Sequence, residues 1–291
     1  MTCMAHAPRV AFQGERGAFS EEAAIKLLGE DVRLVPRQTF ESLFAAVDEG
    51  VADYALAPIE NSLAGSVHRA YDLLLERSLV ITAEVIIPIT HNLIGCPGAS
   101  FDSIATVESH PVALAQCENY FAAHPWIERV ATEDTAGSVR RVLQRNDPTR
   151  AAIAGKRAAK IYGGTILREH LEDHLENYTR FILLARSPGA AGGADKLSLV
   201  IKLRHQPGAL HHALEPLARS GIDLLKIESR PVKGQPWQYR FYLDLQASTN
   251  DPKVSGALSE LQERVAEVRL LGCYPSAQQV GEETELIQTE S

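Results

Sequence analysis

The chain has 291 residues, of which 45% are hydrophobic and 23% are charged, and its formal net charge is −8. This length allows two domains of ordinary size, and the negative charge argues against a general nucleic-acid-binding protein. The longest apolar stretch, residues 79–89, is interrupted by Glu84 and Pro88, so no membrane span is expected. The cysteines are Cys3, Cys96, Cys117 and Cys273; they form no Cys-x-x-Cys pair, which favours a reduced cytoplasmic protein.

Short apolar runs alternate with helical patterns through the first 186 residues. Strands are predicted at residues 9–13, 33–36, 54–57, 79–87, 92–96, 104–107, 129–131, 151–154 and 181–185. Helices are predicted at residues 20–28, 39–49, 67–76, 112–123, 135–144, 156–162 and 166–169. This alternation is typical of α/β domains whose parallel-rich sheets are covered by helices. The strands from residue 92 to residue 154 could form a unit of their own, which suggests two lobes with a cleft.

A Gly/Ala-rich stretch at residues 187–195 predicts a linker, and the order of the elements changes after it. Strands are predicted at residues 197–203, 224–231, 238–246 and 268–273, and helices at residues 209–220 and 253–265. This βαββαβ order is the ferredoxin-like arrangement. We therefore expect one domain at residues 8–186 and a second at residues 196–274, followed by a polar tail at 275–291 that is expected to be disordered.

The first polar corner, from Gly14 to Ser20, lies between a predicted strand and a predicted helix. Glycines at such a corner let backbone N–H groups approach an anion at the helix N-terminus. The spacing matches neither a Gly-x-Gly-x-x-Gly fingerprint nor a Walker loop, which disfavours a nucleotide cofactor. Taken alone, the segment is better explained as a turn in which Ser20 caps the helix.

A second corner holds Glu60, Asn61, Ser62 and Ser66. Loops that follow the carboxyl ends of strands are where open α/β sheets bind ligands. A helix cap by Ser62 or Ser66 is the structural alternative, but four polar residues in seven positions exceed what a cap needs.

A third corner contains Ser109, His110 and Pro111, with Gln116 in the predicted helix that follows. Pro111 suits the first helical turn, where its missing N–H costs nothing. Ser109 is then either the N-cap of this helix or a donor to a substrate. His110 taken alone is more often structural.

The segment from Asn177 to Phe181 begins a predicted strand. The Thr179 hydroxyl could donate a hydrogen bond to a leaving oxygen, and Arg180 could pair with a carboxylate. A short edge strand with a structural arginine explains the same residues equally well.

Two histidines, His170 and His174, have the i, i+4 spacing that suits a metal ion on a helix. The flanking glutamate patterns of metalloproteases are absent, however, and the segment is polar throughout. A solvated helix is therefore the favoured interpretation, and neither a metal ion nor any other cofactor is expected.

The ordered combination of these segments resembles the prephenate dehydratase family, and the small domain resembles the amino-acid-sensing ACT module. The matching segments are Gly14–Ser20, Pro58–Val67, Glu108–Cys117, Asn177–Phe181, Pro207–Leu210 and Lys226–Pro231. The resemblance covers roughly residues 9–274. It implies conversion of prephenate to phenylpyruvate, carbon dioxide and water in L-phenylalanine biosynthesis, with phenylalanine as feedback inhibitor. It also implies a two-lobed catalytic domain similar to periplasmic binding proteins, and a homodimer or homotetramer.

The resemblance assigns roles to individual residues. Thr179 would donate to the departing hydroxyl group. The other implied catalytic residues are Asn61, Ser109 and Gln116. The implied substrate-binding residues are Arg180, Ser62, Gly65, Ser66, Gly17 and Phe181. The implied phenylalanine-binding residues are Gly208, Ala209, Leu210, Asp223, Glu228, Ser229, Arg230 and Pro231.

The sequence departs from the family pattern where Asp223, Leu224 and Leu225 replace the Asn-Leu-Thr of many relatives. An aspartate could attract the ammonium group of phenylalanine, whereas loss of the threonine hydroxyl removes a donor. No chorismate mutase helix is expected before residue 9, which favours a monofunctional enzyme. Two alternatives remain open: an arogenate dehydratase, and a non-catalytic amino-acid sensor.

Overall fold

The computed structural model describes residues 7–188, 193–204, 206–232 and 234–277. Within these residues the chain forms two compact units: residues 7–77 with 85–182, and residues 78–84 with 183–277. The expected linker falls partly outside the described residues, because residues 189–192 do, and so do residues 278–291 of the expected disordered tail.

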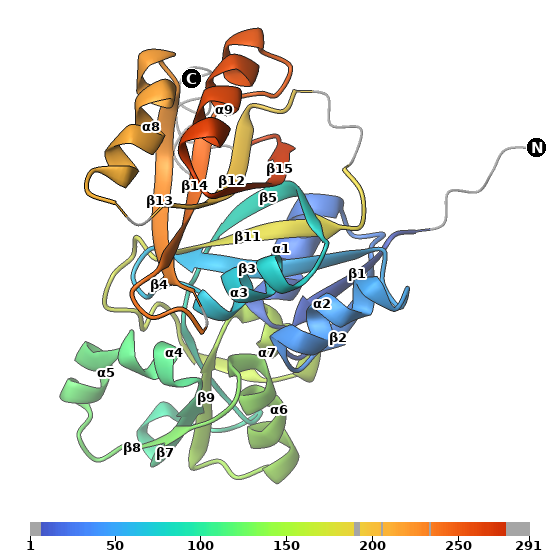
Figure 1. Cartoon of the computed structure of the whole chain (residues 1–291). Coiled ribbons are helices and arrows are strands. Elements are labelled where there is room, and N and C mark those ends of the chain that lie inside the picture. The colour runs from blue at the N-terminus through green and yellow to red at the C-terminus, as the bar shows by residue number, and fades with distance from the viewer. Residues whose placement is uncertain (1–6, 189–192, 205, 233, 278–291) are drawn as a thin grey trace, which may run out of the picture. The chain divides into compact units, whose positions relative to one another are not determined.

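The first lobe is built on a sheet with the strand order β2-β1-β3-β11-β5, and β4 pairs with β3 (Figure 1). The first part of β5 and the end of β11 fall in the second unit. Its strands are β1 (Arg9–Gln13), β2 (Arg33–Arg37), β3 (Tyr54–Asn61), β4 (Gly65–Ser66), β5 (Val80–Pro88) and β11 (Tyr178–Ala185). Its helices are α1 (Phe19–Leu28), α2 (Phe40–Asp48) and α3 (His68–Glu76). Both β2 and β3 run parallel to β1. The buried run Val10, Ala11 and Phe12 explains why β1 lies in the interior of the sheet.

The second lobe is built on a sheet with the order β10-β6-β9-β7-β8. Its strands are β6 (Asn92–Gly95), β7 (Thr106–Ser109), β8 (Glu128–Ala131), β9 (Arg150–Ala154) and β10 (Thr165–Arg168). Its helices are a 3-10 turn (Phe101–Ser103), α4 (Pro111–Ala115), α5 (Glu118–Ala123), α6 (Thr135–Arg145) and α7 (Lys156–Tyr162). Neighbouring residues of β6, Leu93 and Ile94, belong to different hydrophobic clusters. Side chains alternate between the faces of a strand, so each cluster covers one face of this sheet.

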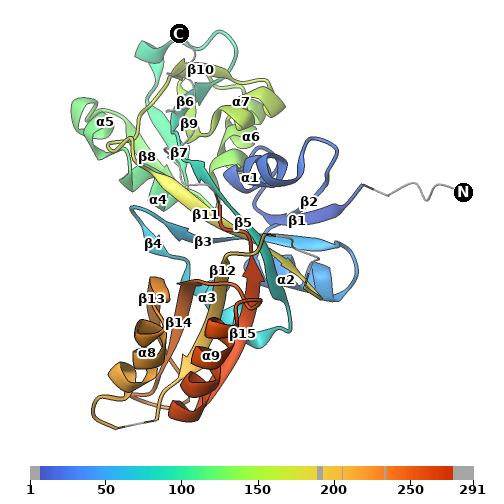
Figure 2. The same ribbon diagram turned by 90° about the horizontal axis from the view of Figure 1, so that it is seen from above.

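Two segments connect the lobes. The chain enters the second lobe between β5 and β6 and returns between β10 and β11 (Figure 2). The two crossovers are hydrogen-bonded to each other: Leu171 N–H donates to His91 O at 2.8 Å, and Ile89 N–H donates to Asn177 O at 2.8 Å. The expected two-lobed α/β fold is confirmed.

The second unit has the expected ferredoxin-like fold. Its elements are β12 (Lys196–Lys202), α8 (Ala209–Arg219), β13 (Asp223–Pro231), β14 (Tyr239–Gln246), α9 (Pro252–Arg264) and β15 (Glu267–Tyr274). The strand order is β13-β14-β12-β15, and all neighbours are antiparallel. Leu197, Leu199 and Ile201 of β12 share a buried cluster with Leu217 of α8 and Leu261 of α9, so both helices cover the same face of the sheet.

Three local predictions were wrong. The helix predicted at residues 112–123 is interrupted, because α4 ends at Ala115 with Gln116 as its C-cap and α5 begins at Glu118. The helix predicted at residues 166–169 is strand β10, which pairs antiparallel with β6. Residues 170–174 form no helix, because His170 has φ 55° and tertiary contacts bury Leu171 and Glu172. The start of the tail is also ordered, since Ser276 N–H and Oγ–H donate to the Asp195 carboxylate.

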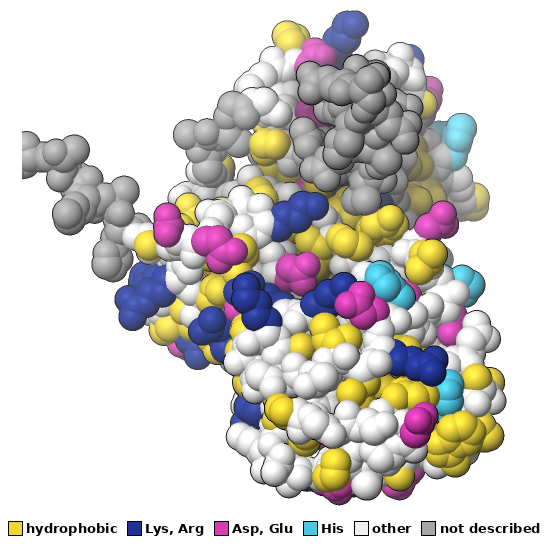
Figure 3. All heavy atoms as spheres, turned by 180° about the vertical axis from the view of Figure 1, so that it is seen from behind, with side chains coloured by type: hydrophobic (Ala, Val, Ile, Leu, Met, Phe, Trp, Pro, Cys, Tyr) yellow, Lys and Arg dark blue, Asp and Glu magenta, His cyan; other side chains and the backbone are white. Residues whose placement is uncertain are grey.

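The surface carries both charge signs. On the face drawn in Figure 3, basic and acidic side chains are interspersed with hydrophobic ones. Within the described ranges, no helix is both long and apolar enough to cross a membrane.

Candidate active site

A cavity of about 430 Å³ lies between the two lobes of the first unit. Its polar lining comprises Gln13, Ser20, Asn61, Ser66, His91, His110, Gln116, Glu133, Asp134, Thr135 and Thr179. The aromatic side chains of Phe19, Phe40 and Phe181 form part of its apolar wall. The lining comes from the carboxyl ends of β1 and β3 and the start of β11, and from the N-terminal turns of α1, α4 and α6. The cavity is thus where the three polar corners of the sequence meet.

Asn61 is the centre of the polar network. Its Oδ1 accepts hydrogen bonds from the backbone N–H groups of Leu63 (3.0 Å) and Ala64 (2.7 Å). These two backbone donors fix which end of the amide is oxygen, since only an oxygen can accept from them. The Nδ2 group therefore faces the other way, where its two hydrogens are shared among three acceptors: Asn177 Oδ1 (2.8 Å), Tyr178 O (3.0 Å) and Thr179 Oγ1 (3.0 Å). Because the Thr179 oxygen accepts such a bond, its own hydrogen can be directed to a ligand in the cavity.

Asn177 and Gln116 complete a triangle of amides with Asn61. Asn61 Nδ2 donates to Asn177 Oδ1 at 2.8 Å, and Asn177 Nδ2 donates to Gln116 Oε1 at 3.0 Å. Gln116 Nε2 then lies 3.4 Å from Asn61 Oδ1. Each amide orientation follows from the one before it, so the backbone of residues 63 and 64 sets the direction of the whole triangle.

The alternation of strand β11 decides which residues reach the cavity. Thr179 and Phe181 line it, whereas Arg180 between them does not. Neighbouring side chains of a strand point to opposite faces. Arg180 Nη1 lies 3.9 Å from Glu60 Oε2 instead. The geometry therefore does not support the expected carboxylate-binding role of Arg180 in this cavity.

Ser109 also lies away from the cavity. Its side chain is fully buried, and its Oγ–H donates to Ile153 O at 2.6 Å, which ties β7 to β9. Nor does it cap the following helix, because His110 occupies the N-cap position and its Nδ1 accepts from Val112 N–H at 3.2 Å. The N-cap expectation for Ser109 was therefore wrong, and Ser109 does not line the cavity.

Two of the expected substrate-binding residues have structural contacts. Gly17 has φ +86°, and a Cβ there would lie 2.8 Å from the backbone of Ala158 in α7. Its N–H donates to the buried carboxylate of Glu21. Ser62 Oγ–H donates to Glu176 O, and its oxygen accepts from Tyr178 N–H. Neither residue lines the cavity, whereas Gly65 and Ser66 do.

Ser20 does not cap α1, because the N-cap position belongs to Ala18, which has no capping side chain. The first-turn N–H groups of this helix therefore have no side-chain acceptor at the N-cap, and Phe19 and Ser20 line the cavity. The first-turn N–H groups of a helix have no intrahelical acceptor and carry its positive dipole end. This corner can therefore receive an anion.

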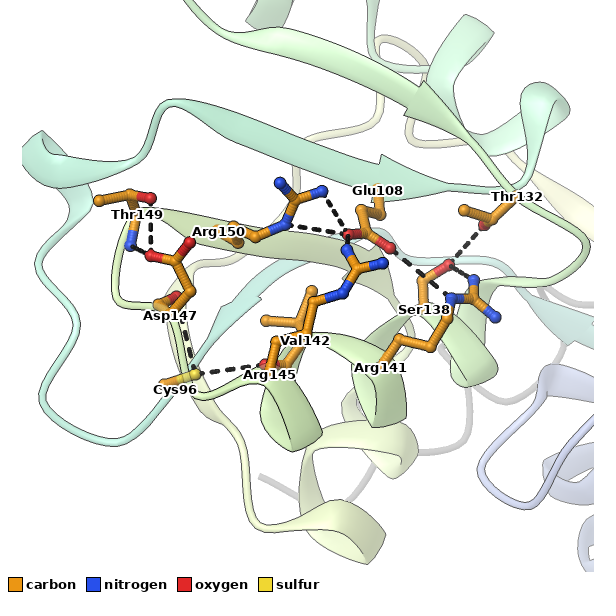
Figure 4. Close-up of polar contacts among 10 residues, drawn as sticks. All are labelled: Cys96, Glu108, Thr132, Ser138, Arg141, Val142, Arg145, Asp147, Thr149 and Arg150. Atoms are coloured by element: carbon orange, nitrogen blue, oxygen red, sulfur yellow. Dashed lines mark hydrogen bonds and ion pairs between the residues drawn. The ribbon is translucent and has the colours of Figure 1, made fainter.

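Glu108, just before the third corner, is an anchor inside the second lobe (Figure 4). Its carboxylate is 1% exposed and accepts from Arg150 Nε (3.1 Å) and Nη2 (2.7 Å) and from Arg145 Nη1 (2.6 Å). Arg141 Nε lies 3.6 Å away. These contacts join β7, β9 and α6, which hold the residues of the third corner in place.

The charges around the cavity are unusual for a site expected to bind a dianion. Among the described lining residues the charged side chains are Glu133 and Asp134, with no lysine or arginine. Asp134 Oδ1 caps α6 by accepting from Gly137 N–H at 2.6 Å. Burial lowers the pKa of both His91 and His110, which favours their neutral forms. Positive potential must then come from helix N-termini.

Sequence reasoning missed two residues of this network. Asn177 was part of a matched segment but received no role, although it is fully buried and joins Asn61 to Gln116. His91 belongs to none of the sequence motifs, and its Nε2 lies 2.8 Å from Gln116 Oε1. Asn177 could have been found as a polar residue beside Thr179, but nothing local marks His91. The described residues contain no group of three or more His, Cys, Asp or Glu side chains that could hold a metal ion.

The comparison with protein families identifies the first unit. The model of the prephenate dehydratase family matches residues 10–189. The chain belongs to the prephenate dehydratase family. The expected enzyme class, a carbon–oxygen lyase, is confirmed at the level of this family. The model of the ACT domain matches residues 197–263.

Known relatives agree with this assignment. The chain is 39% identical over 269 residues to a bifunctional chorismate mutase/prephenate dehydratase of Neisseria gonorrhoeae, covering 92% of this chain and 74% of that one. It is 42% identical over 283 residues to arogenate dehydratase/prephenate dehydratase 1 of Arabidopsis thaliana, covering 92% of this chain and 72% of that one.

Solved structures are similar as well. The prephenate dehydratase of Arthrobacter aurescens, in complex with L-Phe, has a TM-score of 0.83 at 34% identity, covering 92% of this chain and 89% of that one. A protein described as a quorum quenching acylase has a TM-score of 0.84 at 33% identity, covering 92% of this chain and 98% of that one.

The ACT domain contains a hollow of about 310 Å³. Gly208, Ala209 and Leu210 line it, together with Arg204, Trp237 and Tyr239 among others. Gly208 has φ +75° and forms the N-cap of α8. The other expected effector-binding residues lie elsewhere, because Asp223 and residues 228–231 belong to β13 and do not line this hollow.

Proposed function

We propose that this member of the prephenate dehydratase family converts prephenate to phenylpyruvate, carbon dioxide and water. The observation that carries the proposal is the Thr179 hydroxyl at the cavity wall, whose oxygen accepts from Asn61 Nδ2. A hydroxyl held in this way presents its hydrogen to an oxygen that gains negative charge. Residues 8–186 form the catalytic domain in this proposal, and residues 196–274 form the regulatory domain.

The chemistry needs little from the protein beyond positioning and stabilisation of charge. The bond between the ring and its carboxylate breaks, its electron pair moves through the ring, and the carbon–oxygen bond to the hydroxyl group breaks at the opposite end. The ring becomes aromatic, which supplies the driving force. Prephenate carries two negative charges and phenylpyruvate one, so one proton from the medium completes the water molecule.

Thr179 acts in this proposal by hydrogen bonding to the departing oxygen. A threonine is too weak an acid to give up its proton fully at neutral pH, so its contribution is stabilisation of developing charge. Asn61 fixes the direction of the hydroxyl, and the backbone N–H groups of Leu63 and Ala64 fix Asn61. The catalytic roles proposed here for Thr179, Asn61 and Gln116 use side chains that line the cavity. Ser109 is proposed only as a support between β7 and β9.

The substrate carboxylates are proposed to bind at helix N-termini. Phe19 and Ser20 of α1 bring first-turn N–H groups to the cavity wall, whereas the N-terminus of α6 is already capped by the Asp134 carboxylate. Each N-terminus carries roughly half a positive charge and is a common anion site. Ser66 and Gly65 of β4 complete the same wall.

A second candidate, arogenate dehydratase, is favoured by the acidic residues of the lining. Arogenate differs from prephenate by carrying an ammonium group on its side chain. Glu133 and Asp134 could attract that ammonium group, while they repel a dianion. The enzyme could therefore accept both substrates, with Glu133 influencing the preference between them.

Acyl transfer is disfavoured by the surroundings of Thr179. A hydroxyl nucleophile needs an adjacent base to accept its proton. In the described part of the chain, the side-chain contact of Thr179 is the donor Asn61 Nδ2, not an imidazole or a carboxylate. The acylase activity in the name of one structural relative is therefore not proposed here.

Regulation by L-phenylalanine is proposed to act through the ACT domain. The hollow at Gly208–Leu210 offers backbone N–H groups of the first turn of α8 and apolar walls, which suit an amino acid with an aromatic side chain. A homodimer or homotetramer is proposed as the assembly.

Incubation of the purified protein with prephenate tests the proposal. Phenylpyruvate absorbs in the ultraviolet in alkali, and its formation is expected to be abolished by heat denaturation of the enzyme. A parallel incubation with arogenate, in which phenylalanine is measured, tests the second candidate. Ligand binding without turnover of either substrate would identify an amino-acid sensor instead.

A further inference from the structure

His91 lies at the junction between the two lobes, on the crossover from β5 to β6, and its side chain lines the cavity. Its backbone N–H donates to Glu172 Oε2 at 2.7 Å, and its carbonyl accepts from Leu171 N–H at 2.8 Å. The residue is 2% exposed, and its ring packs edge-to-face against the Phe19 ring with 6.0 Å between the centroids. The returning crossover thus fixes the backbone of His91, while its ring extends to the catalytic network.

The hydrogen-bond network determines which ring nitrogen of His91 carries hydrogen. The backbone N–H groups of residues 63 and 64 orient Asn61, Asn61 orients Asn177, and Asn177 Nδ2 donates to Gln116 Oε1. The atom that faces His91 Nε2 at 2.8 Å is therefore an oxygen. Nε2 must donate to it, because two acceptors cannot share a hydrogen bond.

The other ring nitrogen, Nδ1, is buried and has no hydrogen-bond partner among the described residues. In the neutral ring this nitrogen carries only a lone pair, and protonating it would place an unpaired donor in the interior. The groups around the ring are Gln116, the Phe19 ring and the carboxylate of Glu172, which also accepts from His170. Their arrangement favours one tautomer, with hydrogen on Nε2.

We propose that His91 is a positioning residue for the reaction, and this inference rests on the proposed dehydratase function. Gln116 ends the short helix α4, and its Nε2 makes the longest contact of the amide triangle, 3.4 Å to Asn61 Oδ1. Its Oε1 has two donors, Asn177 Nδ2 and His91 Nε2. His91 therefore fixes the Gln116 amide at the cavity wall, beside Asn61 and Thr179.

Two substitutions separate the two ring nitrogens. In His91→Gln the side-chain amide nitrogen reaches the position of Nε2 and keeps the donor to Gln116. In His91→Asn the shorter amide reaches only the position of Nδ1 and loses that donor. We expect His91→Gln to keep kcat for prephenate within about threefold of the parent, and His91→Asn to lower kcat about tenfold with little change in KM, since one hydrogen bond is lost.

The outcomes are distinct. Equal kcat values in the two variants would overturn the proposal. A lower kcat in His91→Gln than in His91→Asn would also overturn it, because the effect would then belong to Nδ1. A second measurement does not need activity: 15N NMR of the intact parent protein is expected to show His91 with hydrogen on Nε2 and a bare Nδ1. The opposite tautomer would also overturn it. A parent enzyme inactive on prephenate and arogenate would refute the proposed function instead, leaving the tautomer measurement to test the geometry.

Discussion

Asn61 donates a hydrogen bond from Nδ2 to Thr179 Oγ1 over 3.0 Å, while two backbone N–H groups hold its Oδ1. The relationship joins the hairpin of β3 and β4 to the start of β11, 118 residues apart in the sequence. It gives the threonine hydroxyl a defined direction, because its oxygen is occupied as an acceptor.

Asn61→Asp tests the direction directly. A carboxylate at residue 61 accepts hydrogen bonds only, so the Thr179 hydroxyl would turn to donate to it and would no longer face the substrate. The expected loss of kcat is roughly 10²–10³, as for removal of a transition-state donor. Asn119→Asp, which changes an exposed asparagine of α5, is the matched control and should leave kcat unchanged. Retention of parental kcat by Asn61→Asp would contradict the assigned role.

Glu133→Gln is expected to change substrate preference. The exposed carboxylate would lose its attraction for the ammonium group of arogenate, and its repulsion of prephenate would disappear. The ratio of kcat/KM for arogenate to that for prephenate should fall about fivefold, which corresponds to ~1 kcal/mol for an exposed charge. Glu128→Gln, on β8 outside the cavity lining, provides the control. An unchanged ratio in Glu133→Gln would show that Glu133 does not influence the preference between the two substrates.

The stability of the protein should fall in mildly acidic solution. Burial lowers the pKa of His91 and His110 below the ordinary value of 6.5, so the unfolded chain binds more protons than the folded one below that pH. Their contribution is present above pH 6.5 and is lost as the pH falls towards the folded-state pKa values. One such group contributes at most about 1.4 kcal/mol per pH unit. The check is to measure melting temperatures between pH 7 and 5 for the parent, for His91→Gln and for the exposed-site control His68→Gln. If the melting temperature falls with pH equally steeply in the parent and in His91→Gln, the prediction is contradicted.

Gly208→Ala is expected to weaken inhibition by phenylalanine at least fivefold while leaving the uninhibited rate unchanged. A Cβ at this position would lie 3.3 Å from His212 Nε2, at the edge of the hollow in the ACT domain. Gly221→Ala is the matched control, since Gly221 also has positive φ (+69°) but lies outside the hollow. Both variants should lose about 1–2 kcal/mol of stability from left-handed strain. Equal sensitivity to phenylalanine in both variants would show that the hollow takes no part in the regulation.

The sequence predicted the fold well because most of its signals are local. The apolar runs, the linker and the βαββαβ order all depend on patterns within a few residues. Strand β10 was missed because its pairing with β6 is set by residues about 70 positions away. The His170–His174 spacing was misleading for a similar reason, since the His91 backbone holds Leu171 and Glu172 in an extended crossover.

Within the site, the family resemblance identified Asn61, Gln116 and Thr179, which the structure brings to one cavity. The motif alone did not show whether the Arg180 side chain reaches the cavity. Thr179 and Arg180 are neighbours in a strand and therefore face opposite sides, a consequence that strand alternation alone predicts. His91 could not have been found this way, because its role depends on a crossover path that only the folded chain defines.

The most direct test of the account is the turnover of prephenate by Thr179→Ala and Thr179→Ser beside the parent enzyme. We predict that Thr179→Ala lowers kcat roughly 10²–10³-fold with little change in melting temperature, because one donor to the departing oxygen is lost. Thr179→Ser keeps the hydroxyl and should retain part of the rate. Turnover by Thr179→Ala within a few-fold of the parent, at unchanged stability, would contradict the claim that this hydroxyl assists departure of the leaving group.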